Sequence, residues 1–270
     1  VIYTKRFYHD IVASGAQAAS PLLFPETVFN APASHLAAIL GITGASYTLV
    51  GDGAVGLLAV KMAEDLMQNE GLDYCLVVGA EEVDWLLCDA YRKWRLLRSA
   101  APIEPFHESP KGMILSEGAG AIVVSRTGAI QIEKVSAGGN YLRRKDVGEI
   151  LGQVFSEFCS DEGDILIGSA NGTFIDLAEQ KAVLEVLPGC LIYTIKSALG
   201  ESVGASAIWQ VIAGAQALLT RQLPPVLHCA LRSSLRISTT KISDAAIQHA
   251  IISTCGLNQQ IAGLRLSAAR

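Results

Sequence analysis

Short runs of hydrophobic, often β-branched residues alternate with longer helical runs along the whole of this 270-residue chain. The pattern predicts strands over 47–50, 74–78, 119–125 and 165–168, and helices over 54–67 and 175–186. Strands that alternate with helices form sheets covered on both faces, because each element must bury its hydrophobic side. The alternation therefore predicts an α/β fold.

One further helical run, residues 203–219, is apolar or small on every side, with Trp209 as its one large residue. A helix that lies on a protein surface has a polar face, so this composition is typical of a helix buried between two layers. We therefore expect an interior layer of helix within the α/β fold.

Composition and charge exclude several classes of protein. Half of the residues are hydrophobic, 17% are charged and the net charge is −5, which excludes a disordered chain. Basic residues are scattered except at 92–98 and 143–145, so we expect no nucleic-acid partner. The longest uncharged stretches, 27–51 and 202–220, contain Pro, Asn, Ser, Thr or Gln, and we interpret them as buried core with no membrane span.

The six cysteines, at positions 75, 88, 159, 190, 229 and 255, form no C-x-x-C pair and have no histidine at metal-ligand spacing. We expect free thiols, a cytoplasmic location, no metal site and no cofactor.

A series of segments, taken in order, resembles the motifs of the β-ketoacyl synthases. These segments are 21–30 (PLLFPETVFN), 47–60 (YTLVGDGAVGLLAV), 73–81 (DYCLVVGAE), 105–120 (PFHESPKGMILSEGAG), 170–173 (ANGT), 196–204 (KSALGESVG) and 253–259 (STCGLNQ). The resemblance implies a thiolase-like layered α/β/α/β/α fold, with the family's N-terminal strands missing. It also implies two parts, the remainder of the N-terminal ketosynthase half at 1–128 and the C-terminal half at 129–270.

The catalytic positions depart from this family. Its decarboxylative condensation needs a cysteine thiolate that accepts the acyl chain and two histidines that hydrogen-bond the malonyl thioester carbonyl. The resemblance places Gly53 at the cysteine, Asn171 at the first histidine and Glu201 at the second, and it retains Lys196. A glycine cannot attack a thioester, and a carboxylate at the second histidine position would repel a malonyl carboxylate. We expect no condensation by this chain.

The remaining polar residues have structural interpretations. Asp52 precedes the helix that starts near Gly53, so it is predicted to be a helix N-cap. Lys196 and Glu201 are predicted to form an ion pair that neutralises the former pocket. We expect Asn171 to hydrogen-bond nearby backbone and Cys255 to be a small core residue.

The resemblance further implies interface and tunnel residues. The strand before the nucleophile turn is the family's dimer strand, which here consists of Ser46, Tyr47, Thr48, Leu49 and Val50. The residues predicted to border the acyl tunnel are Leu22, Leu23, Phe24 and Leu257.

Two functions follow from these observations. The first is a non-catalytic subunit, often called the chain-length factor, that heterodimerises with an active ketosynthase and meets the acyl carrier protein through that complex. Such subunits occur in type II polyketide, polyene or fatty-acid-like biosynthesis. The second is a decarboxylase or hydrolase of the same fold that acts on a carrier-bound thioester with Asp52, Glu201 or Asn171. An open pocket with perturbed carboxylates would favour the second function and a filled pocket the first.

Overall fold

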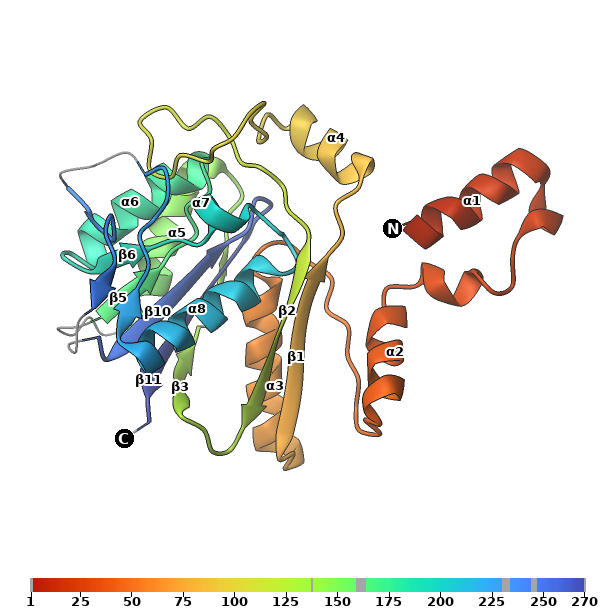
Figure 1. Cartoon of the computed structure of the whole chain (residues 1–270), viewed down its shortest axis with the longest axis horizontal. Coiled ribbons are helices and arrows are strands. Elements are labelled where there is room, and N and C mark those ends of the chain that lie inside the picture. Colours follow the sequence, from red (N-terminus) through yellow and green to blue (C-terminus); the bar gives the residue numbers. More distant parts are fainter. Residues whose placement is uncertain (1, 137, 159–163, 230–233, 244–246, 270) are drawn as a thin grey trace. The chain divides into compact units, whose positions relative to one another are not determined.

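The structure is a computed structural model that describes residues 2–136, 138–158, 164–229, 234–243 and 247–269 (Figure 1). The chain forms two compact units, one of Val1–Val50 with Asp84–Leu86 and the other of Gly51–Val83 with Leu87–Arg270. The predicted division at residue 128 rests on resemblance to a family and not on compactness, and it stays a prediction.

The larger unit is built on a seven-stranded mixed sheet whose strand order is β3-β11-β10-β5-β6-β8, with β4 also paired to β11. Its strands are β3 (Ile130–Val135), β4 (Gly139–Asn140), β5 (Asp164–Ile167), β6 (Leu191–Tyr193), β8 (Arg236–Ile237), β10 (His249–Cys255) and β11 (Gln260–Ala268). The centre of the sheet is parallel from β10 through β5 and β6 to β8, whereas β11 runs antiparallel to both β10 and β3.

A second sheet in this unit pairs β1 (Tyr74–Glu81) with β2 (Gly118–Ser125) in antiparallel register from Tyr74 opposite Ser125 to Glu81 opposite Gly118. Both strands are where the sequence pattern predicts them. Strands β7 (Gln222–Leu223) and β9 (Ile242–Ser243) form a short antiparallel sheet, and β7 follows directly after helix α8 (Ser206–Thr220).

Two helices, α3 (Val55–Glu70) and α8 (Ser206–Thr220), form the interior layer. Helix α8 contacts β1 and β2 on one side and β10 and β11 on the other, which confirms the buried helix that the composition predicts (Figure 1). The layers approach closely where glycine leaves room. A Cβ at Gly79 would lie 2.6 Å from the carbonyl oxygen of Gly204, and one at Gly56 would lie 2.7 Å from the Cβ of Ala207.

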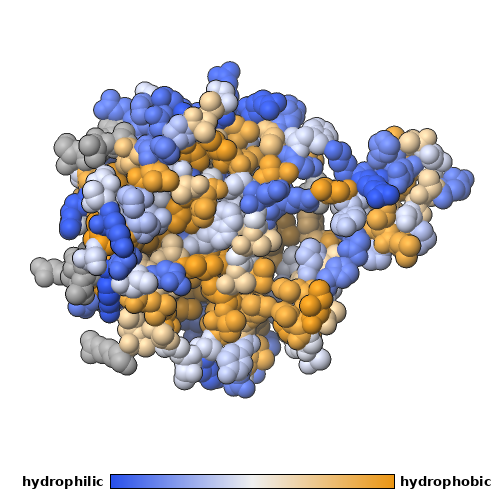
Figure 2. Space-filling model, in the orientation of Figure 1, coloured by the Kyte–Doolittle hydropathy of each residue, from blue (hydrophilic) through white to orange (hydrophobic). Residues whose placement is uncertain are grey.

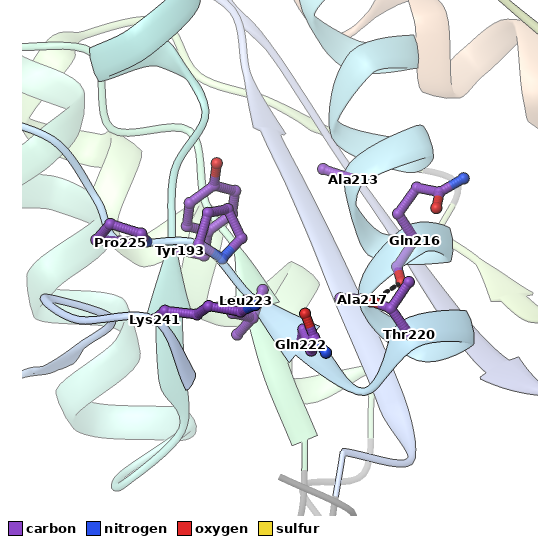
Figure 3. Close-up of a pocket in the computed structure, with 10 residues that line it drawn as sticks. Tyr193, Ala213, Gln216, Ala217, Thr220, Gln222, Leu223, Pro225 and Lys241 are labelled. Atoms are coloured by element: carbon purple, nitrogen blue, oxygen red, sulfur yellow. Dashed lines mark hydrogen bonds between the residues drawn. The ribbon is translucent and has the colours of Figure 1, made fainter. Parts of the chain in front are cut away.

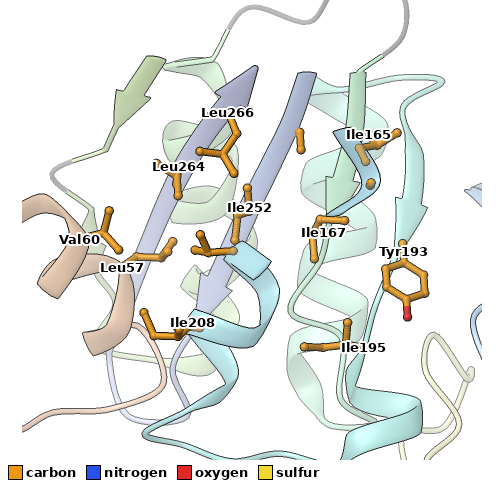
Figure 4. Close-up of a cluster of buried hydrophobic side chains, with 14 of the residues drawn as sticks. Leu57, Val60, Ile165, Ile167, Tyr193, Ile195, Ile208, Ile252, Leu264 and Leu266 are labelled. Carbon is orange, nitrogen blue, oxygen red and sulfur yellow. The ribbon is translucent and has the colours of Figure 1, made fainter. Parts of the chain in front are cut away.

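Hydrophobic clusters pack against both faces of the large sheet, because neighbouring residues of a strand point to opposite faces. In β5, Ile165 and Ile167 face the α3–α8 layer, where Leu57 and Ile208 join them (Figure 4). Leu166, between the two isoleucines, belongs instead to the cluster that includes α5 (Val147–Ser156) and α6 (Phe174–Val186). These layers of helix and sheet form the thiolase-like α/β fold that the sequence predicts.

The smaller unit contains α1 (Ile2–Ser14), the 3-10 helices η1 (Ala16–Ala18) and η2 (Phe24–Thr27), and α2 (Ala31–Leu40). Within this unit, the Phe24 ring lies 5.8 Å from the buried Phe7 ring of α1, centroid to centroid. The hydroxyl of Thr4 donates to the carbonyl of Thr27 at 3.3 Å.

Residues 47–50, predicted as a strand, form no strand in the described part of the chain. A strand needs a neighbour whose backbone groups pair with its own, and no described strand is paired with this segment. Its large side chains Tyr47, Leu49 and Val50 are exposed. The hydrophobic pattern is present, but the segment pairs with no strand among the residues that the structure describes.

No helix among the described residues is long and apolar enough to cross a membrane.

Candidate functional site

Asn171, Lys196 and Glu201 meet in the interior of the larger unit. Lys196 begins the short helix α7 (Lys196–Leu199), Glu201 follows that helix, and Asn171 lies in the loop after β5. The Lys196 Nζ donates to Glu201 Oε2 at 2.7 Å, and the Asn171 Nδ2 donates to the same oxygen at 2.6 Å. Lys196 is 2% exposed, Glu201 is 3% exposed and Asn171 is fully buried. The predicted ion pair is present, and the cluster is closed to solvent.

The Asn171 side chain connects Glu201 to Thr173. Its Oδ1 accepts hydrogen bonds from the hydroxyl of Thr173 at 2.6 Å and from the backbone N–H of Thr173 at 3.2 Å. Thr173 is in turn the N-cap of α6, where its hydroxyl accepts the N–H of Ile175. The expected hydrogen bond of Asn171 to nearby backbone is present at Thr173, and the side chain also bonds Glu201 and the Thr173 hydroxyl, which the sequence analysis did not predict.

Two buried carboxylates of α6 hold the loop that carries Asn171. The carboxylate of Asp176 accepts N–H groups of Phe106, Asn171 and Gly172 at 2.7–3.1 Å. That of Glu179 accepts N–H groups of Ser169 and Ala170 at 2.7 and 3.0 Å. The sequence analysis missed both, although two acids three residues apart lie on one face of a helix, and this spacing is the signal that could have found them.

Burial dominates the electrostatics of these two acids. It raises the pKa of Asp176 to about 6 and the pKa of Glu179 to about 7, because desolvation of the charged form outweighs the hydrogen bonds that the carboxylates accept. The positive charge of Lys196 acts in the opposite direction on both. These carboxylates therefore hold the loop while they remain partly protonated near neutral pH.

Gly53 lies just before α3, next to the loop between β10 and β11. A Cβ at this position would lie 3.5 Å from the Cα of Gly256 and 3.7 Å from the carbonyl oxygen of Cys255, which are ordinary contact distances. The fold therefore has room for a side chain at Gly53. The assignment of this position to the family's nucleophile stays a prediction.

Asp52 is not the N-cap of α3, which corrects the sequence prediction. The N-cap residue is Ala54, and no side chain caps the helix. The carboxylate of Asp52 instead accepts the N–H groups of Gly53 and Leu257 on Oδ1, at 2.7 and 3.0 Å, and that of Asn258 on Oδ2 at 2.5 Å. Burial, with a smaller contribution from the charge of Glu201, raises the pKa of Asp52. Asp52 thus binds the β10–β11 loop to the start of α3.

The β10–β11 loop itself is ordered by backbone contacts. The Gly256 N–H donates to the carbonyl of Gln260 at 2.7 Å, and the Tyr141 hydroxyl donates to the Gly256 carbonyl at 2.8 Å. Cys255 is 2% exposed in the core, as predicted, and burial raises the pKa of its thiol well above the ordinary value. Leu257 packs at the edge of the hydrophobic clusters that contain Tyr91 and Phe106.

The predicted interface and tunnel residues fall mostly in the smaller unit. Leu22 is 86% and Phe24 58% exposed, and Leu23 is intermediate. Leu257 belongs to the larger unit. The tunnel and interface assignments stay predictions.

The two basic segments of the sequence come together on the surface of the larger unit. The Arg144 guanidinium donates to the carbonyl of Trp94 at 3.4 Å and lies 4.7 Å above the centre of the Phe174 ring. Five exposed basic residues are close to Trp94 or Arg144 in the sequence, and two of them pair with acids, Lys93 with Asp89 and Arg143 with Asp146. The five are Arg92, Lys93, Arg95, Arg143 and Lys145. We call these five residues with Arg144 the basic surface.

A separate cavity of about 340 Å³ lies between the C-terminal half of α8 and the segment that includes Leu223 and Pro225 (Figure 3). Hydrophobic side chains line it together with polar ones, which are Tyr193, Gln216, Thr220, Gln222 and Lys241. None of the predicted catalytic residues lines it.

Among the described residues, no group of three or more His, Cys, Asp or Glu side chains could hold a metal ion. Cys75, Cys88, Cys190, Cys229 and Cys255 are free thiols. Cys159 lies outside the described residues.

Comparison with known proteins identifies the family to which these features belong. Residues 5–129 match the model of the β-ketoacyl synthase N-terminal domain, and residues 151–230 match that of the C-terminal domain. No curated protein sequence matches the chain.

Solved structures share the fold at low sequence identity. The ishigamide ketosynthase/chain length factor has a TM-score of 0.84 and 18% identity, over 99% of this chain and 72% of that one. A β-ketoacyl synthase from Burkholderia phymatum STM815 has a TM-score of 0.84 and 14% identity, over 100% and 73% of the two chains. AntDE:AntF, a type II PKS acyl-carrier protein in complex with its ketosynthase bound to the hexaketide, has a TM-score of 0.84 and 15% identity, over 99% and 75%.

The buried ion pair leads to a first prediction about stability. Glu201→Gln leaves the Lys196 ammonium buried without the carboxylate that pairs with it, and we expect a loss of roughly 3–5 kcal/mol in the free energy of unfolding. The double variant Lys196→Met with Glu201→Gln removes the charge together with its partner, so it should recover most of that loss. Urea unfolding of the four proteins of this cycle measures the coupling. A double variant no more stable than Glu201→Gln would contradict the pairing.

The second prediction concerns pH. Glu179 binds its proton more tightly in the folded chain, with a pKa of about 7, than in the unfolded chain, with a pKa of 4.5. The free energy of unfolding should therefore fall as pH rises from about 4.5 to about 7, by on the order of 3 kcal/mol from this group. Glu179→Gln should remove that part of the pH dependence.

Urea unfolding at pH 5 and pH 8 tests this, with Glu185→Gln as the matched control on the exposed side of α6. A Glu179→Gln variant whose stability changes between the two pH values as much as that of the wild type would rule out the assignment.

Proposed function

Because this chain belongs to the β-ketoacyl synthase family, we propose that it is a non-catalytic ketosynthase-like subunit of the chain-length-factor type. In this role it heterodimerises with an active β-ketoacyl-ACP synthase in type II polyketide, polyene or fatty-acid-like biosynthesis. It meets the acyl carrier protein through that complex.

The observation that carries this proposal is the closed, charge-compensated cluster at the catalytic positions. Lys196 and Asn171 both donate to Glu201 Oε2, all three residues are at most 3% exposed, and Gly53 offers no nucleophile. A malonyl thioester would have to displace a buried ion pair to reach this place, which costs several kcal/mol. Such a site favours a structural role.

The alternative, a decarboxylase or hydrolase that acts on a thioester, needs an open pocket with a free acid or base. Glu201 is engaged by both Lys196 and Asn171, and Asp52 is engaged by three backbone N–H groups. This engagement supports the non-catalytic role over the alternative.

Exposed hydrophobic side chains support a protein partner. Residues 2–50 contain 14 of the 27 large hydrophobic side chains that are exposed among the described residues. Tyr47, Leu49 and Val50, in the predicted dimer strand, belong to this group, and Figure 2 shows hydrophobic residues at the surface of the N-terminal segment. Exposed apolar surface of this extent is typical of a region that becomes buried in an assembly.

The basic surface supports the contact with the acyl carrier protein. It gathers six Lys and Arg side chains on a chain whose net charge is −5. Opposite charges steer two proteins together and orient them, so this surface fits a partner with an acidic face. We assign the carrier-protein contact to the basic surface as part of the proposal.

We expect that the chain alone cannot be acylated, because Gly53 has no side chain with which to form a thioester. Incubation with acyl-CoA or acylated carrier protein, followed by intact mass measurement, should show no adduct, whereas an active ketosynthase treated in parallel should show one. Gly53→Cys should fit the fold but should not restore condensation while Asn171 and Glu201 remain. A covalent adduct near Gly53 in the wild type would exclude the non-catalytic role.

The interface assignment is tested at Leu49. If residues 46–50 pair with a strand of the partner, Leu49→Asp places a carboxylate in buried surface, at a cost above the roughly 2–5 kcal/mol of losing a buried leucine. We expect Leu49→Asp to abolish co-purification with a cysteine-bearing ketosynthase that the wild-type chain binds.

The matched control is Leu184→Asp on α6, because Leu184 is 43% exposed and Leu49 is 38% exposed. Leu184→Asp should co-purify as the wild type does. Equal recovery of the ketosynthase with both variants would place the interface elsewhere.

A further inference from the structure

The cavity at the C-terminal part of α8 lies within the larger unit and apart from the predicted catalytic residues (Figure 3). One wall is a face of α8, to which Ala213 and Ala217 both belong because they are four positions apart. Figure 3 shows Tyr193, Pro225 and Lys241 on the opposite wall. The two alanines have small side chains, so the helix leaves space between the walls.

The wall opposite α8 is held by hydrogen bonds within the chain. Strand β7 pairs with β9, and Lys241 directly precedes β9. The hydroxyl of Ser238 donates to the carbonyl of Pro224 at 2.8 Å, and the carbonyl of Ser238 accepts the N–H of Val226 at 2.6 Å. The shape of the cavity therefore rests on the chain's own contacts, which is a property of pre-formed binding sites.

Two hydrogen-bond donors in this wall have no partner in the part of the chain that the structure describes. Tyr193 is 8% exposed, and its hydroxyl bonds no described residue, although a buried tyrosine hydroxyl normally has a partner. Burial raises the pKa of this hydroxyl, so it stays protonated and is able to donate. The ammonium of Lys241 forms no ion pair with the described residues. Figure 3 shows the Tyr193 hydroxyl pointing away from Lys241, so the two donors serve different ends of a ligand.

Charge and size define the ligand that fits. Lys241 is the only charged residue in the described lining, and the C-terminal end of α8 carries partial negative charge, so an anionic group binds on the Lys241 side. Buried apolar residues of the lining, such as Ala217 and Leu223, suit a hydrophobic body. A volume of about 340 Å³ is that of roughly eleven water molecules, which corresponds to a ligand of about a dozen non-hydrogen atoms.

We propose that this cavity binds a small organic monocarboxylate whose apolar body carries an uncharged oxygen at the end opposite the carboxylate. Lys241 pairs with the carboxylate, Ala213, Ala217 and Leu223 contact the body, and the Tyr193 hydroxyl donates to the far oxygen. The inference goes beyond the proposed function, because it needs neither a partner subunit nor a thioester.

Three probes of nearly equal shape separate the contributions of charge and of the far oxygen. The first is 3-(4-hydroxyphenyl)propanoate, which should bind the whole chain in calorimetric titration with a dissociation constant on the order of 1 mM. The second, 3-(4-hydroxyphenyl)propan-1-ol, lacks the charge and should bind about tenfold more weakly. The third, 3-phenylpropanoate, lacks the far oxygen and should bind about threefold more weakly.

Substitutions should remove these differences one at a time. Lys241→Met should weaken both acids about tenfold and leave the alcohol unchanged. Tyr193→Phe should weaken both hydroxyphenyl probes about threefold and leave 3-phenylpropanoate unchanged. Lys134→Met is the matched control, because Lys134 is an exposed lysine that pairs with Glu157 and is not part of the lining. It should bind all three probes as the wild type does.

Two further measurements locate the bound probe. Ala217→Leu fills the space and should abolish binding, and Ala213→Leu does the same at a less buried position if Ala217→Leu fails to fold. Nuclear Overhauser effects should connect the aromatic protons of the probe to the methyl groups of Ala213 and Ala217. The absence of binding at about 10 mM of the first probe would overturn the proposal. Binding that neither Lys241→Met nor Ala213→Leu weakens would overturn it equally.

Discussion

Hydrogen bonds from backbone N–H groups to buried carboxylates hold together the part of the larger unit where the family has its active site. Glu179 binds the loop after β5 at Ser169 and Ala170, and Asp176 binds it at Asn171 and Gly172. Asp52 binds the β10–β11 loop to the start of α3 in the same way. Loop N–H groups that no strand or helix satisfies need such acceptors when they are buried, so the positions of Asn171 and of the loop beside Gly53 depend on these three acids.

The same region packs a lysine and a glutamate together in the core. Lys196 Nζ donates to Glu201 Oε2 at 2.7 Å, and both side chains are at most 3% exposed. Asn171 donates to the same oxygen and connects it to the N-cap of α6. Glu201 Oε1 has no hydrogen-bond partner among the described residues, so the cluster engages one of the two carboxylate oxygens.

Two parts of the surface are suited to contacts with other proteins. These are the hydrophobic residues exposed on the N-terminal segment and the basic surface around Arg144. Within the larger unit, the close contacts at Gly56 and Gly79 hold the layers that carry the basic surface.

Local patterns in the sequence determined much of the fold, because the periodicity of α3, α6, α8, β1 and β2 is visible within each segment. They also located Gly53, Asn171, Lys196 and Glu201, and the Lys196–Glu201 pair was predictable because the two residues are five positions apart. The role of Asp52 was not, since its partners Leu257 and Asn258 are more than two hundred residues away and its own neighbourhood resembles a helix cap. The prediction of a strand at 47–50 was wrong for a similar reason, because a strand needs a pairing partner from another segment. Hydrogen-bond partners that come from distant segments, or from another chain, are chosen by tertiary packing and leave no mark in the local sequence.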